Sequence, residues 1–149
     1  MIAARPLQGR VMAPSVLLDT CAAIWLMDAA PMTQASLDAI RAAQRAHAGV
    51  FVSPISAWEL ATLARKNRIQ LNRSPEIWFD TLLGLPGIRL APMPPSVLIA
   101  SAALPGDPPR DPADRIIAAT ARAQGQTIIT RDGELIPYGQ AGHVSVMGC

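Results

Sequence analysis

The 149-residue chain is poor in cysteine and aromatic residues and has no long apolar segment. Its two cysteines, Cys21 and Cys149, cannot build a disulfide framework, so we expect free thiols in the reducing cytoplasm. No apolar stretch approaches the roughly 18 residues that span a membrane, so no membrane partner is expected. Aromatic residues make up only 4% of the chain. Alanine supplies much of the apolar content and favours helix, which predicts closely packed helices.

Lysine is almost absent, since Lys66 is the single lysine beside 12 arginines, and the net charge is only +2. Arginine binds phosphate through a bidentate fork, which suits nucleic acid. A GC-rich genome produces the same arginine and alanine bias, so composition alone leaves both explanations open.

The length predicts one domain with its own core. The first residues contain Arg5 and Arg10 but no apolar segment of signal-peptide length, so export is not expected. We expect residues 1–13 to form a flexible N-terminal extension, with Met12 as an alternative start, and residues 14–149 to form the domain.

Short apolar runs alternate with segments of helical periodicity along the whole domain. Ser-Pro and Asp-Pro pairs predict helix starts at residues 53–54, 74–75 and 111–112, and Gly125 predicts a helix end. The expected strands are 15–19, 50–53, 87–92, 126–130 and 142–148, and the expected helices are 21–28, 33–47, 54–67, 76–85, 95–104 and 112–124. This alternation predicts an α/β fold with a parallel sheet covered by helices on both faces.

Four acidic residues lie at junctions between these strands and helices: Asp19, Glu59, Asp114 and Asp132, with Asp111 beside the third. Ligands of parallel sheets bind at the carboxyl ends of the strands, so we expect the five side chains to share one pocket there. Converging carboxylates repel one another and are normally kept to hold a divalent cation. Oxygen ligands suit Mg²⁺ or Mn²⁺. The pattern therefore favours metal-dependent phosphodiester cleavage.

Each acidic residue also has a structural interpretation when taken alone. Asp19 and Asp111 fit helix N-caps, Glu59 favours a helix dipole, and Asp132 fits an ordinary turn. Asp114 begins the apolar face of its helix, which favours a functional role. The joint pattern is stronger than any single member.

Several other features have structural interpretations. Trp58 is expected in the core rather than as a base-stacking platform, and His47 and His143 are expected to be structural or on the surface. The cluster Arg65-Lys66-Arg68 is interpreted as a solvated helix end, with RNA contact as the alternative. Phosphate-loop and dinucleotide glycine motifs are absent from the sequence. A receiver domain would need a lysine near the last strand, where none stands.

The order and spacing of four sequence pieces resembles the PIN-domain ribonucleases, and within them the VapC-type toxins. The resemblance extends from about Ser15 to Val146. The pieces are LLDT at 17–20, SPISAWEL at 53–60, DPADRIIAATA at 111–121 and TRD at 130–132. The resemblance implies a PIN-like, Rossmann-like three-layer α/β/α fold with a central, mainly parallel sheet, Mg²⁺ or Mn²⁺ at the acidic cluster, and cleavage of single-stranded RNA.

The resemblance also implies roles for particular residues and partners. Asp19, Asp114 and Asp132 would be metal ligands, directly or through water, and Glu59 would complete the metal shell or position the attacking water. Asp111 is an auxiliary acidic residue, and RNA or orienting contacts are expected from Thr20, Thr130, Arg115 and Arg131. The family further implies a homodimer inhibited by a cognate antitoxin. An inactive RNA- or protein-binding module, or a housekeeping nuclease without an antitoxin, remains the alternative.

Overall fold

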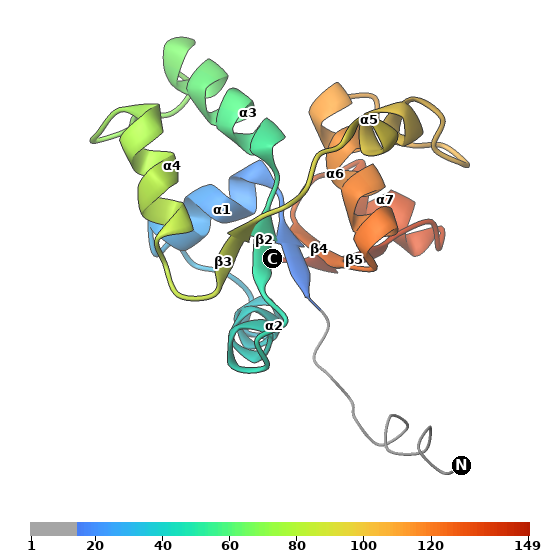
Figure 1. Cartoon of the computed structure of the whole chain (residues 1–149), viewed down its shortest axis with the longest axis horizontal. Helices are drawn as coiled ribbons and strands as arrows, with labels where there is room; N and C mark the ends of the chain where they lie inside the picture. The colour runs from blue at the N-terminus through green and yellow to red at the C-terminus, as the bar shows by residue number, and fades with distance from the viewer. Residues whose placement is uncertain (1–14) are drawn as a thin grey trace.

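A computed structural model describes residues 15–149, and within this range the chain forms seven helices and one five-stranded sheet (Figure 1). The predicted N-terminal extension, residues 1–13, lies outside the described range. In sequence order the elements are β1 (Val16–Leu18), α1 (Thr20–Met27), α2 (Gln34–Arg45), β2 (Val50–Val52), α3 (Pro54–Arg65), α4 (Pro75–Leu83), β3 (Ile88–Leu90), α5 (Pro95–Ala102), α6 (Pro112–Gln124), β4 (Thr127–Thr130), α7 (Leu135–Gln140) and β5 (Ser145–Gly148).

The sheet has the strand order β3-β2-β1-β4-β5, and every neighbouring pair is parallel. The order reverses direction at β1, from which β2 and β3 continue on one side and β4 and β5 on the other. β1 pairs with β4 so that Leu18 lies opposite Ile129. The residues that follow these two positions, Asp19 and Thr130, therefore leave the sheet side by side at its carboxyl edge.

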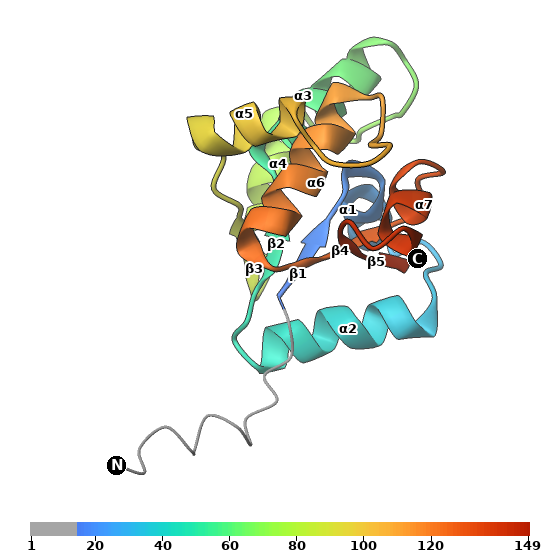
Figure 2. The same cartoon turned by 90° about the vertical axis from the view of Figure 1, so that its right-hand side faces the viewer.

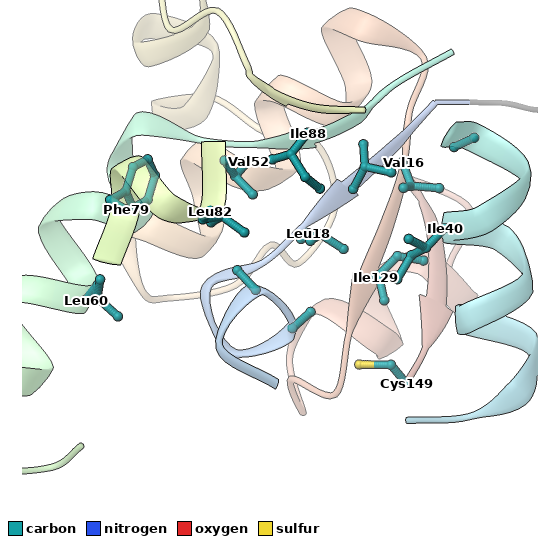
Figure 3. Close-up of a cluster of buried hydrophobic side chains, with 14 of the residues drawn as sticks. Val16, Leu18, Ile40, Val52, Leu60, Phe79, Leu82, Ile88, Ile129 and Cys149 are labelled. Atoms are coloured by element: carbon teal, nitrogen blue, oxygen red, sulfur yellow. The ribbon is translucent and has the colours of Figure 1, made fainter. Parts of the chain in front are cut away.

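Side chains alternate across the sheet and fill two separate cores. Val16 and Leu18 belong to the larger core, with residues of α1, α2, α3 and α4 (Figure 3). Leu17 points to the opposite face and packs with residues of α6 and α7. Figure 2 shows α2 and α6 on opposite sides of the sheet. The predicted three-layer arrangement is confirmed, and the sheet is parallel throughout.

The predicted helix starts use the expected caps. The Ser53 and Ser74 hydroxyls accept hydrogen bonds from the amides of Ile55 and Ile77, at 3.1 and 3.2 Å, and each precedes a proline at the first helical position. At the other end of α6, Gly125 adopts the left-handed conformation predicted for a helix end, with φ of 65°.

One helix is missing from the sequence-based expectation. Helix α7 contains Pro137 and Gly139, both unfavourable inside helices, and it has only six residues. Its first turn is supported by tertiary packing, because Leu135 and Tyr138 are buried in the core beneath α6. The helix propensity of these residues did not predict α7.

The exposure of Trp58 is the second difference from the sequence-based expectation. The sequence predicts it in the core, but its side chain is 63% exposed on α3, whereas Leu60 two residues later is buried. The apolar character of α3 does not form a single stripe, so periodicity placed Trp58 on the wrong side. In the described part of the chain, no helix has the length and apolarity needed to cross a membrane.

Candidate active site

One cavity of about 340 Å³ lies beyond the carboxyl ends of β1 and β4. We call it the acidic cavity. It brings together all five acidic residues singled out from the sequence, which come from four separate segments. Its walls are Asp19, Thr20, Cys21, Trp25, Glu59, Leu63, Asp111, Asp114, Arg131 and Asp132. The predicted convergence at the carboxyl edge is therefore found.

Asp19 is buried at the end of β1, and both of its carboxylate oxygens have partners within the protein. Oδ1 accepts a 2.8 Å hydrogen bond from the amide of Ala22, which caps α1. Oδ2 accepts a hydrogen bond from the hydroxyl of Thr130 at the end of β4. Asp19 thus caps α1 and lines the acidic cavity at the same time.

The hydroxyl of Thr130 joins two of the predicted metal ligands. While it donates to Asp19, its oxygen accepts a 2.9 Å hydrogen bond from the backbone amide of Asp132. Thr130 is fully buried, so this connection is shielded from water. It orients one carboxylate directly and fixes the backbone that carries the other.

Thr20 also orients a carboxylate, which is that of Glu59 and not that of the adjacent Asp19. Its hydroxyl donates to Oε1 of Glu59 on α3 and lies 2.9 Å from the hydroxyl of the buried Ser56. This cluster ties the start of α1 to α3. Ser56 is a supporting residue that the sequence did not reveal, because one more serine on a helix carries no chemical signal.

Asp111 caps α6 and Asp132 closes the turn that leads into α7, and both line the cavity. Asp111 Oδ1 accepts from the amide of Ala113 at 2.7 Å at the start of α6. Asp132 Oδ2 accepts from the amides of Glu134 and Leu135, both at 2.9 Å, where α7 begins. Backbone amides at helix starts stabilise negative charge. These bonds fix both carboxylates in place before any ligand arrives.

Burial and mutual repulsion make the carboxyl groups hard to ionise together. Burial, followed by the charges of Asp132, Asp111, Glu59 and Asp19, raises the pKa of Asp114 to about 8. Burial also raises the pKa of Asp19 and of Glu59, although the hydroxyls of Thr130 and Thr20 work in the opposite direction. Strongly perturbed carboxyl groups that share a cavity are typical of functional sites.

A cation stands at the rim of this cavity. The guanidinium of Arg131 lies 3.9 Å from the centroid of the Trp25 ring and donates a 2.7 Å hydrogen bond to the carbonyl of Pro31. These two contacts hold an otherwise exposed arginine in one place. Trp25 was not singled out from the sequence, because its partner lies more than 100 residues away in the chain.

Arg115 does not take the position expected for an RNA contact. Its guanidinium donates to the backbone carbonyls of Ser101, Pro109 and Ala102 at 2.9, 3.1 and 3.3 Å. It joins α6 to the end of α5 and the following loop, and it does not line the acidic cavity. Its donors are used inside the protein rather than solvated or free for phosphate.

The histidines and the basic cluster lie outside the acidic cavity, as predicted. His143 stacks on Tyr138 with ring centroids 4.9 Å apart, and His47 is exposed after α2. Arg65, Lys66 and Arg68 are all exposed at the end of α3.

The donor set of the acidic cavity suits a hard divalent cation. It offers carboxylate oxygens, and their raised pKa values mean that a cation would relieve their repulsion. Within residues 15–149, no three His, Cys, Asp or Glu side chains are already grouped to hold an ion. Mg²⁺ retains several waters and usually needs only one or two carboxylates with substrate phosphates, so this open arrangement fits it better than a closed cage would.

The sequence pattern of the PIN domain matches residues 16–139, a stretch that includes all five acidic residues. The chain therefore belongs to the PIN-domain family. It is 38% identical over 121 residues to Ribonuclease VapC22 of Mycobacterium tuberculosis (strain ATCC 25618 / H37Rv), which covers 81% of this chain and 89% of that protein.

Two solved structures share the fold at low sequence identity. A crystal structure of VapBC2 from Rickettsia felis, bound to a DNA fragment from its promoter, matches with a TM-score of 0.64 at 13% identity, covering 90% of this chain and 98% of that one. DNA-bound VapBC from Salmonella typhimurium matches with a TM-score of 0.56 at 18% identity, covering 91% and 98%. These likenesses agree with the family assignment at the level of fold.

The metal-free protein is predicted to lose stability as the pH rises. Between 3.8, the ordinary pKa of Asp, and the folded-state pKa of about 8, Asp114 holds a proton in the folded protein that the unfolded chain releases. The free energy of unfolding therefore falls with rising pH through this window. In EDTA, the melting temperature of Asp114→Asn should fall less than that of the wild type between about pH 5 and about pH 8.5.

Thermal melts followed by circular dichroism measure both pH slopes. Asp80→Asn, which removes an exposed carboxylate on α4 outside the cavity, is the matched control and should keep the wild-type slope. Equal slopes for Asp114→Asn and the wild type would contradict the prediction.

Cys21 is predicted to be a slow thiol despite lining the cavity. Burial, with the surrounding carboxylates, raises its pKa from 9.0 to about 11, which leaves about 100-fold less thiolate at neutral pH. The greater nucleophilicity of a high-pKa thiolate recovers roughly tenfold. Alkylation by iodoacetamide in a Cys149→Ser background should therefore be about tenfold slower than that of free cysteine, and Mg²⁺ should accelerate it. Mass spectrometry measures the rate, and a rate equal to that of free cysteine would refute the prediction.

Proposed function

We propose that this protein is a metal-dependent endoribonuclease that cleaves single-stranded RNA and acts as the toxin of a toxin–antitoxin pair. The observation that carries the nuclease proposal is the convergence of five carboxyl groups from four separate segments on one cavity. Membership of the PIN-domain family and similarity to Ribonuclease VapC22 support RNA as the substrate.

Asp19, Asp114 and Asp132 would hold the Mg²⁺ or Mn²⁺ ion, directly or through water. When bound, such an ion polarises a phosphate oxygen and lowers the pKa of the attacking water. Thr130 keeps Asp19 and Asp132 at a fixed separation through its two hydrogen bonds. The chain thus provides a preset arrangement of negative charge.

Glu59 either completes the ion's shell or positions the attacking water. Its hydrogen bond from Thr20 limits the positions that its carboxylate can take. Asp111 is an auxiliary member whose cap bond to α6 leaves one carboxylate oxygen for solvent or ligand. Arg131 is the proposed phosphate contact at the rim, because stacking on Trp25 presents a preorganised guanidinium beside the carboxylates.

The partner proposals rest on the relatives and on surface chemistry. The solved VapBC complexes motivate a cognate antitoxin, which would insert an arginine or lysine into the acidic cavity. A homodimer is supported by the exposed apolar side chains Leu90, Leu98 and Ile99 on β3 and α5. Both cysteines are free, in keeping with the reducing cytoplasm.

The nuclease proposal predicts loss of cleavage when single acidic residues are neutralised. Asp19→Asn and Asp114→Asn should each lower kcat/KM on single-stranded RNA by at least about a hundredfold, because fixed charges at a reacting centre contribute on this scale. Thr130→Val should lower it by roughly 10- to 100-fold by releasing the carboxylates that it orients. Asp80→Asn is the matched control and should retain wild-type cleavage.

Purified proteins are assayed on a fluorescent oligoribonucleotide with Mg²⁺, with Mn²⁺ and with EDTA. Folding of each variant is checked by thermal melting, since removing one of several repelling charges should leave the fold intact. Cleavage that persists in EDTA, or in both Asp→Asn variants, would rule the mechanism out. An inactive wild type would favour a PIN-like binding module.

The toxin proposal predicts that the wild-type chain stops growth when it is induced alone. Induction of Asp19→Asn at equal abundance should leave growth normal, and coexpression of the neighbouring small gene with the wild type should restore it. Colony counts after induction measure the effect, and immunoblotting checks abundance. Normal growth with abundant wild-type protein would leave a housekeeping nuclease as the remaining interpretation.

A further inference from the structure

Helix α3 exposes a tryptophan next to the active-site residue Glu59. The Trp58 side chain is 63% exposed, although a tryptophan side chain is usually mostly buried. This chain has only three tryptophans. Because water contact with so much apolar surface is unfavourable, Trp58 is a candidate contact for a ligand.

The surroundings of Trp58 are cationic. Trp58, Thr62, Arg65 and Lys66 line one surface cavity of about 580 Å³, which we call the tryptophan face. Residues 58, 62 and 65 are spaced four and three apart, so they follow one side of the helix. Arg65 and Lys66 are both exposed at its end.

The same helix forms a wall of the acidic cavity. Glu59 and Leu63 line that cavity, and each comes one residue after a member of the tryptophan face. Consecutive helix residues point about 100° apart, so the two surfaces are adjacent sides of α3. Figure 1 shows α3 between α4 and α6, with its end projecting from the body of the domain.

The proposed reaction requires affinity for RNA, and the tryptophan face has the aromatic and cationic groups that provide it. RNA is a polyanion and the five carboxyl groups that line the acidic cavity repel it, so cationic and aromatic groups beyond Arg131 would add to the affinity for the substrate. An aromatic ring with adjacent cations is the common means of binding single-stranded nucleic acid without sequence preference. The positive charges of Arg65 and Lys66 would repel a basic antitoxin segment, so the tryptophan face suits RNA better than such a segment.

We propose that the tryptophan face binds a nucleotide of the RNA substrate next to the cleaved phosphodiester, an inference that rests on the proposed nuclease function. A base stacks on the exposed indole of Trp58, and Arg65 and Lys66 contact the adjoining phosphates. Trp58, which the sequence predicts in the core, is thus a contact for the RNA base. Arg65 and Lys66 of the basic cluster are contacts for its phosphates.

The test separates binding from chemistry by steady-state kinetics on a fluorescent single-stranded oligoribonucleotide in Mg²⁺. Trp58→Ala should raise KM by roughly 5- to 100-fold, the range of one lost base stack, while kcat changes less than about twofold. Trp58→Phe, which keeps an aromatic ring, should recover most of the affinity. Ile77→Ala, which truncates a 57% exposed apolar side chain on α4, is the matched control and should leave KM unchanged.

The charge contribution is read from the dependence of KM on salt. The double variant Arg65→Gln and Lys66→Gln should reduce the slope of log KM against log salt concentration by about 1.4, since each phosphate contact on a single strand contributes about 0.7. Arg41→Gln, an exposed arginine on α2, is the control and should keep the wild-type slope. The double variant and its Arg41→Gln control test the proposal even if Trp58→Ala folds poorly.

The outcomes distinguish this inference from the proposed function. A wild type that cleaves no RNA overturns the nuclease itself. A cleaving wild type whose KM and salt slope are unchanged in all tryptophan-face variants overturns only the inference. Unchanged KM with lost inhibition by the coexpressed small partner would assign the face to a protein instead, and would equally overturn it.

Discussion

The structure is organised around the repulsion between carboxylates in a partly buried cavity. Burial and neighbouring charges raise the pKa of Asp114 to about 8 and those of Asp19 and Glu59 above their usual range. Such a group stays together only where surrounding donors hold its charged members and where a member such as Asp114 can keep its proton. Backbone amides at the starts of α1, α6 and α7 hold three of them, and threonine hydroxyls hold Asp19 and Glu59.

Sheet topology explains how Thr130 can hold Asp19 from a distant position in the chain. The parallel register of β1 against β4 places Asp19 beside Thr130, 111 residues apart in the chain. Helices that start at the same edge direct their amides toward the same place, so the caps that stabilise the fold also fix the site. Asp19, Asp111 and Asp132 therefore support the fold and line the acidic cavity at the same time, because a carboxylate oxygen that accepts a backbone hydrogen bond still has a lone pair.

The sequence predicted the strands, six of the seven helices within residues 15–149 and the convergence of the acidic residues, because those features depend on local caps and on sheet topology. Contacts set by tertiary packing could not be predicted. Helix α7 forms despite Pro137 because its buried side chains complete a core, and the side of α3 that carries Trp58 could not be predicted because the apolar residues of this helix form no single stripe. Arg115 donates to carbonyls of α5 and of the loop that follows it, and Thr20 donates to Glu59. The spacing of these residues in the sequence indicates neither partner.

The central claim is that a divalent cation occupies the acidic cavity and displaces a proton that burial and the neighbouring carboxylates hold there. Calorimetric titration of Mn²⁺ at about pH 7, in two buffers of different ionisation enthalpy, measures both binding and the number of protons released. Because Asp114 is mostly protonated at that pH, the account predicts release of about one proton per bound ion in the wild type and clearly less in Asp114→Asn. Failure of Mn²⁺ to bind, or binding with no proton release, would contradict it.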